Sequence, residues 1–148
     1  MLNQLSLPLF EFFNGKNVSD KQHEALFLLS VDEEQWPHVA MISVGEIVAM
    51  NEAELRLSLW RNSVTTTNII RTGQATIVVI LGGIAYYIKL SVQEQSILDE
   101  RQRFVATIAS IREDVAKYAD IISGVRIQLK EPQPVIQHWK ETIEDMLK

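Results

Sequence analysis

The sequence predicts a mainly β fold (β+α), in which antiparallel strands are flanked by helices. Between residues 25 and 92, apolar residues repeatedly occupy every second position, the period of a strand with one buried face. Turn residues separate these segments, and Gly82-Gly83 is the strongest hairpin signal among them. Helical periods occur towards both ends. We therefore expect five or six strands joined by short turns, which close into a barrel and so remove the sheet edges.

The first elements are a short helix and a strand. Residues 7–15 predict the helix, because Pro8 suits its first turn and Gly15 suits its C-terminal stop. Residues 17–24 form a polar link. The mostly apolar run from Ala25 to Val31 predicts the first strand.

The next segment contains three extended stretches. Residues 32–35 predict a turn, and residues 37–44 a second strand with a bulge or bend at Gly45. Residues 46–50 continue in extended form. Apolar and polar residues alternate over residues 54–59, which predicts a strand with one buried face.

A short helix is expected between Trp60 and Gly73, with Ser63 as its N-cap and Gly73 as its C-cap. The β-branched run from Ala75 to Leu81 predicts a strand covered on both faces. The strand that returns after the glycine pair has one apolar face, formed by Tyr86, Ile88, Leu90 and Val92.

After Val92 the spacing of apolar residues becomes helical. It predicts a long amphipathic helix from about Glu94 to Tyr118, covering one end of the barrel or part of a dimer interface. Residues 125–129 alternate again and predict a last strand, and a C-terminal helix follows Pro132. The apolar stripe of the long helix consists of Ile97, Phe104, Ile108, Ile111, Val115, Tyr118 and Ile122.

Length and composition limit the function. A chain of 148 residues predicts a single domain over residues 1–148. With no cysteine, thiolate catalysis, disulfides and iron–sulfur clusters are excluded. The formal charge of −5 argues against a nucleic-acid partner. The N-terminus lacks the pattern of a signal peptide, and glycines and a lysine interrupt the longest apolar run, so we expect a soluble cytoplasmic protein without a membrane partner.

Common catalytic and metal-binding motifs are absent from the sequence. His23, His38 and His138 lie on three different expected elements, and none has a second histidine within four residues, so no metal site is expected. The sequence also lacks a G-x-S-x-G elbow, a G-x-G-x-x-G loop and a Walker lysine loop.

A polar cluster at residues 61–68 is the strongest binding signal. It falls at an expected helix start, where free N–H groups favour an anion, and Arg61 precedes it. The simpler interpretation is that Ser63 caps the helix and the threonines are surface residues. Aromatic residues could stack on a flat ring or pack in the core; these are Trp36, Trp60, Tyr86, Tyr87 and Trp139.

In the order of these features, residues 26–92 resemble the FMN-binding split β-barrel of the pyridoxamine 5′-phosphate oxidase-like superfamily. The expected first hairpin has the family's turn followed by x-Pro-His-Val, here at Trp36 to Val39. Residues 63–69 resemble the family's S-R-K-x-x-N-L helix start. Three further segments fit the pattern: the strand before this helix (55–60), the strand after it (74–79) and the tail from Gly124 to Trp139.

The resemblance implies a split antiparallel barrel that forms a homodimer with two FMN molecules at the subunit interface. The flavin phosphate would lie near the helix start and the preceding strand. The family's Arg-Lys pair falls on Val64 and Thr65, and Arg61 is the candidate replacement for the missing charge. The implied cofactor-binding residues are His38, Trp60, Arg61, Ser63, Thr65, Thr66 and Asn68.

Two functions remain open on the sequence. The first is a flavin-dependent oxidoreductase, in which the ring of FMN carries out hydride or electron transfer. The second is a cofactor-free split-barrel dimer acting as a binding or regulatory module. The replacement of the family's lysine by Thr65 would be the sequence sign of this function. A third, weaker alternative is another flat anionic ligand, such as haem or a different flavin, near His38. No residue identifies a substrate or a catalytic acid or base.

Overall fold

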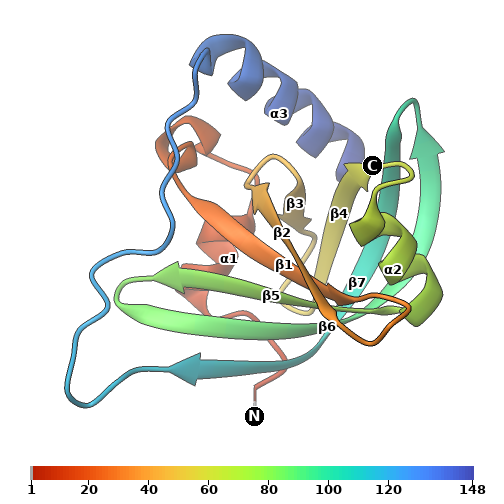
Figure 1. The fold of residues 1–148 in the computed structure, drawn as a ribbon. Helices are drawn as coiled ribbons and strands as arrows, with labels where there is room; N and C mark the ends of the chain where they lie inside the picture. The colour runs from red at the N-terminus through yellow and green to blue at the C-terminus, as the bar shows by residue number, and fades with distance from the viewer. Residues whose placement is uncertain (1) are drawn as a thin grey trace.

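The computed structural model describes residues 2–148 and is built on a curled seven-stranded antiparallel sheet, so the predicted fold class is confirmed (Figure 1). The strand order is β2-β1-β5-β6-β7-β4-β3. The strands are β1 (Ala25–Val31), β2 (Pro37–Ser43), β3 (Ile47–Ala49), β4 (Glu54–Trp60), β5 (Gln74–Leu81), β6 (Ile84–Leu98) and β7 (Arg101–Asp114). The helices are α1 (Leu7–Phe13), the 3₁₀ turn η1 (Val18–Lys21), α2 (Val64–Thr72) and α3 (Pro132–Met146).

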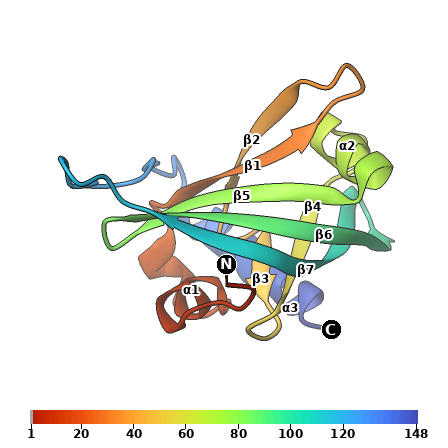
Figure 2. The same ribbon diagram turned by 90° about the horizontal axis from the view of Figure 1, so that it is seen from below.

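The hydrophobic core fills the concave side of the sheet. Leu28, Leu57, Ile77, Ile88 and Phe104 point into it from five strands and are fully buried. The short helices close the open side, because apolar side chains of α1 and α3 belong to the same core. In Figure 2 the β1–β2 hairpin rises away from β5, β6 and β7, with α2 beside its tip. No helix within residues 2–148 is both long and apolar enough to cross a membrane.

The sheet does not close completely. Its two edge strands, β2 and β3, are joined by residues 44–46 and do not pair with each other. The split barrel that the family resemblance implies is therefore confirmed, whereas the edge-free closure suggested by the strand pattern alone is not found. The bend expected at Gly45 lies in this link. A Cβ atom at Gly45 would stand 2.1 Å from the Trp139 indole of α3, so the close packing of α3 there requires a glycine.

The predicted long helix is wrong. Residues 94–114 form the last third of β6, the turn after it and β7, and so the sheet has seven strands rather than five or six. A β-bulge explains the misleading spacing. Leu90 pairs with Ile108 and Lys89 pairs with Ser110, which leaves Ala109 unpaired. The extra residue shifts the inward face from Ile108 to Ile111, and a step of three residues imitates a helix.

Other expectations for the second half of the chain also need correction. Val115, Tyr118 and Ile122 lie in an irregular connection and are exposed. Residues 125–129 form no strand, since only Arg126 bridges to Glu24, just before β1. Strand β5 is buried on one face alone: within this chain its Thr76, Val78 and Ile80 side stays half-exposed.

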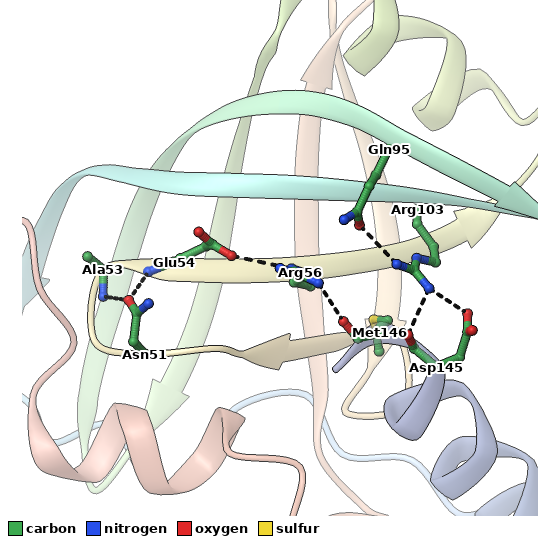
Figure 3. A network of polar contacts seen from close by, with 8 residues as sticks. All are labelled: Asn51, Ala53, Glu54, Arg56, Gln95, Arg103, Asp145 and Met146. Atoms are coloured by element: carbon green, nitrogen blue, oxygen red, sulfur yellow. Dashed lines mark hydrogen bonds and ion pairs between the residues drawn. The ribbon is translucent and has the colours of Figure 1, made fainter. Parts of the chain in front are cut away.

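The C-terminal end of α3 is held by two arginines of the sheet (Figure 3). Arg56 of β4 donates from Nη1 to the Met146 carbonyl at 3.1 Å. Arg103 of β7 donates to the Asp145 carbonyl at 2.8 Å and forms an ion pair with its carboxylate at 3.2 Å. Cations at this end of a helix are favourable, because the last carbonyl groups are partly negative.

Candidate functional site

The start of α2 is organised by a compact set of hydrogen bonds. Ser63 is the N-cap: its Oγ accepts from the Thr66 N–H at 3.1 Å and donates to the Thr66 Oγ1 at 3.1 Å. Thr66 Oγ1 in turn donates to the Trp60 carbonyl at 2.7 Å. Both hydroxyl groups are therefore occupied within the chain. The N–H groups of Val64 and Thr65, in the first turn, remain without an intrahelical acceptor.

Trp60 is the last residue of β4 and lies directly before this turn. Its side chain is 58% exposed, which is unusual for the largest apolar side chain. The guanidinium of Arg101, its cross-strand partner on β7, stacks over the indole ring at 4.6 Å from the centroid. Arg101 is held there by Ser58, which accepts from Nη2 through its carbonyl at 2.8 Å and from Nε through Oγ at 3.2 Å.

A half-buried carboxyl group lies behind this arginine. Glu46 accepts hydrogen bonds from the Ser43 N–H and Oγ, both at 3.2 Å. Burial raises the pKa of Glu46, and the Ser43 hydrogen bonds and the charge of Arg101 oppose that shift. Burial lowers the pKa of Arg101, and Glu46 opposes that shift. Within residues 2–148 Arg101 makes no ion pair with any carboxylate, so its charge is only partly balanced.

His38 belongs to a second polar group, under the other side of α2. It is the cross-strand partner of Ser30, so the two side chains share one face of the β1–β2 pair. The buried Asn68 of α2 donates from Nδ2 to Ser30 Oγ at 3.1 Å. Arg71 then donates to Asn68 Oδ1 at 3.3 Å and to the Val31 carbonyl. These bonds fasten α2 to the end of β1.

Two hollows adjoin α2. One, of about 300 Å³, separates the helix from the turn after β1; three carboxyl groups, of Asp32, Glu33 and Glu34, stand on one wall and Arg71 on the other. This charge disfavours a phosphate in the hollow. Asn62 and Val64, at the start of α2, also line it, so a phosphate at the first turn would need the charge of Arg61 to offset these carboxylates. The other hollow, of about 410 Å³, lies where Arg71 and Gln74 approach the end of β1. Neither hollow is lined by Trp60 or Ser63.

The structure therefore divides the predicted site residues into two groups. Trp60, Ser63 and Thr66 form the capped turn, while Asn68 donates to Ser30, whose cross-strand partner is His38. Thr65 is buried in the first turn of α2, and Arg61 is exposed on the turn before it.

The sequence interpretation missed Arg101, because the long helix predicted across residues 94–118 hid its pairing with Trp60. It also missed Ser30, although a serine near the end of an apolar strand was a visible signal. Among residues 2–148 no three histidine, aspartate or glutamate residues are grouped in a way that could hold a metal ion.

The sequence was compared with family models, with known proteins and with solved structures. No family model matches the sequence. The uncharacterised protein YclD of Bacillus subtilis strain 168 is 48% identical over 149 residues, spanning 98% of this chain and 97% of that protein.

Solved structures with the same fold are more distant in sequence. A Lactobacillus delbrueckii protein assigned to the pyridoxamine 5′-phosphate oxidases has a TM-score of 0.59 at 14% identity, covering 75% of this chain and 95% of its own. An FMN-binding protein from Syntrophomonas wolfei has a TM-score of 0.54 at 14% identity, with coverage of 72% and 86%. The flavin reductase of styrene monooxygenase from Pseudomonas putida S12 has a TM-score of 0.52 at 11% identity, with coverage of 64% and 81%.

Proposed function

Since the chain belongs to the same family as YclD of Bacillus subtilis and has the pyridoxamine 5′-phosphate oxidase-like split-barrel fold, we propose that it is a single-domain flavoprotein that binds FMN as a homodimer. The observation that carries the proposal is the first turn of α2. It offers two free N–H groups, the exposed cation of Arg61 and the exposed ring of Trp60 at one place on the split barrel.

The residues present fit FMN through a smaller set of contacts than the sequence pattern implied. The hydroxyls of Ser63 and Thr66 complete the helix cap, so the phosphate would be held by the N–H groups of Val64 and Thr65 and by Arg61. Trp60 provides an aromatic surface beside them. Bound FMN would supply hydride or electron transfer, chemistry that the side chains of this cysteine-free protein do not provide.

The proposed dimer interface is the convex face of β2, β1, β5 and β6. Cross-strand partners place Met41, Phe27, Val78 and Tyr87 in one row across these four strands. Met41 and its neighbour Val39 are each more than half exposed. An apolar row of this kind matches a second copy of itself across a two-fold axis.

A specific observation favours the cofactor-free alternative. Val64 and Thr65 carry no charge where the resembling family has an Arg-Lys pair, and the cap occupies the Ser63 hydroxyl. The same fold would then serve as a binding or regulatory dimer. Flavin binding separates the two candidates directly.

The test is titration of the purified protein and its Arg61→Gln variant with FMN and riboflavin, followed by flavin fluorescence. If Arg61 contacts the phosphate, the variant loses roughly 1–3 kcal/mol of FMN binding and keeps its affinity for riboflavin, which has no phosphate. Arg126→Gln is the matched control, because it removes an exposed arginine charge beside the β5–β6 turn, away from the first turn of α2. Equal FMN affinity in all three proteins would show that the phosphate does not contact Arg61.

A further inference from the structure

The connection between β7 and α3 exposes large apolar side chains. Tyr118 is 94% exposed and Ile122 96% exposed, and no other large apolar residue within residues 2–148 is exposed to that extent. Residues 115–124, here called the connecting segment, have no regular secondary structure, and residues 115–123 make no backbone hydrogen bond within the described chain. The segment projects beyond the ends of β5, β6 and β7 (Figure 1, Figure 2). Apolar side chains gathered on a projecting segment indicate an interaction surface.

Both ends of the connecting segment are fixed to the sheet. At the end of β7, the Tyr87 hydroxyl donates to Asp114 Oδ2 at 2.7 Å. On the side of α3, the Ala25 N–H donates to the Val125 carbonyl at 3.1 Å. Because its ends are held, the segment loses less conformational entropy when its exposed part binds a partner.

The base of the connecting segment lies on the convex face of the sheet. A Cβ atom at Gly124 would stand 3.1 Å from the Cβ atom of Ile80, on the outward side of β5. Ala85, the cross-strand partner of Ile80, is only 5% exposed although it does not belong to the hydrophobic core. Ile80 is two residues from Val78, a member of the apolar row proposed as the dimer interface. The connecting segment therefore continues that row at the β5–β6 turn.

The apolar row is too small to hold a dimer by itself. A stable interface buries about 800 Å² on each partner and uses roughly 20–30 residues a side. Within the chain, Phe27, Val78 and Tyr87 of the row are each already half-buried. The connecting segment adds exposed apolar surface beside the row, and the charges of its Lys117 and Asp120 cancel. A second copy can therefore cover the row and the segment together, and two-fold symmetry makes each contact occur twice.

We propose that the connecting segment of each chain packs against the convex face of a second copy, with Tyr118 and Ile122 as the anchoring side chains. Burial of their apolar surface is favourable, and tyrosine is enriched among the residues that contribute most to binding at interfaces. The partner is the second copy of the proposed homodimer, so this inference rests on the proposed function. It adds to the interface a contact that the apolar row does not contain.

The first test compares the dissociation constant of the dimer in the wild type and in a variant that carries both Tyr118→Ser and Ile122→Ser, measured by sedimentation equilibrium. Both side chains are exposed within one chain, so circular dichroism should show an unchanged fold. We expect the dissociation constant to rise roughly tenfold or more, because each copy loses buried apolar surface. Leu7→Ser is the matched control: it removes an exposed apolar side chain of α1, outside the segment, and should leave the constant unchanged.

The second test locates the contact. The chain has no cysteine, so Ile122→Cys provides a single attachment site for the photoreactive probe benzophenone-4-maleimide. Mixing unlabelled and isotopically labelled copies distinguishes cross-links between chains from those within one chain. We expect cross-links from position 122 to the partner's β1, β2, β5 or β6, and none to these strands from a probe at Leu7→Cys. This test leaves Tyr118 in place and so remains decisive if the double variant folds poorly.

The outcomes separate this inference from the proposed function. An unchanged dissociation constant in the folded double variant, or cross-links confined to one chain, overturns the inference while the proposed flavoprotein dimer stands. A dimer that depends on Tyr118 and Ile122 but takes up no FMN supports the inference, and the flavoprotein proposal fails. A wild type that stays monomeric at millimolar concentration overturns both the proposed homodimer and the role of the connecting segment.

Discussion

Gly45 illustrates how one residue determines the packing of a helix against the split in this barrel. The link between the two edge strands covers residues 44–46, and the Trp139 indole of α3 lies directly on Gly45. A side chain at this position would collide with the large, buried Trp139 ring. The glycine thereby sets how closely α3 approaches the split.

We predict that Gly45→Ala destabilises the protein by about 3 kcal/mol, because the new Cβ would stand 2.1 Å from the Trp139 ring. The measurement is urea unfolding followed by circular dichroism. Gly82→Asn is the control, since Gly82 has a positive φ that asparagine tolerates and a Cβ added there would meet no atom within 4 Å. A Gly45→Ala variant as stable as the wild type would contradict the packing described here.

Single residues also show where sequence reasoning about the site succeeds. The cap at Ser63 was predictable, because a serine before a helical segment has a local signature. The stacking of Arg101 on Trp60 was not, since it depends on the pairing of two strands far apart in the sequence and on a helix prediction that proved wrong. A helix cap can be recognised from neighbouring residues in the sequence. A cross-strand contact can be recognised only when the pairing register of the two strands is known.

At the scale of elements, α3 depends on polar contacts as well as on its apolar face. Arg103 is mostly buried, its ion pair with Asp145 joins β7 to the end of the helix, and its Nη2 also donates to Gln95 at 3.3 Å (Figure 3). Arg103 Nε is buried without a hydrogen-bond partner in residues 2–148. The buried charge of the guanidinium is therefore stabilised only through the contacts of Nη1 and Nη2.

Asp145→Ala should cost about 1–2 kcal/mol of stability, because it removes the carboxylate that balances this mostly buried arginine. Glu24→Ala should cost less than about 0.5 kcal/mol, since its partner Arg126 is 58% exposed and their separation is 3.6 Å. Chemical denaturation of the two variants makes the comparison. Equal losses would mean that the Asp145 pair does not anchor α3.

Strand β7 shows why element prediction failed in one region and held elsewhere. Strand β4 has alternating apolar and polar residues, and β1 and β5 are continuous apolar runs, so the sequence located each of them. In β7 the bulge at Ala109 changes the phase in which inward and outward residues alternate. Ala106 also points inward, but it is too small to be counted among the large apolar residues that predicted the helix. A bulge is a tertiary feature with no local signal of its own.

For the whole molecule, the proposed dimer should depend on the apolar row of Met41, Phe27, Val78 and Tyr87 on the convex face of β2, β1, β5 and β6. Met41→Asp places a charge in that row and should convert the dimer to monomers, as measured by light scattering. Leu7→Asp is the control, because Leu7 is an even more exposed apolar residue on α1, outside the row. A dimer that survives Met41→Asp would require a different interface.

The central claim is that this split barrel holds one FMN per chain at the first turn of α2. Equilibrium dialysis of the freshly purified protein against FMN tests it most directly, with the visible spectrum reporting the flavin taken up. The account predicts saturation at one FMN per chain, with half-saturation at micromolar concentration or below. A colourless protein that takes up no FMN at millimolar concentration would contradict it and leave the cofactor-free dimer as the function of this fold.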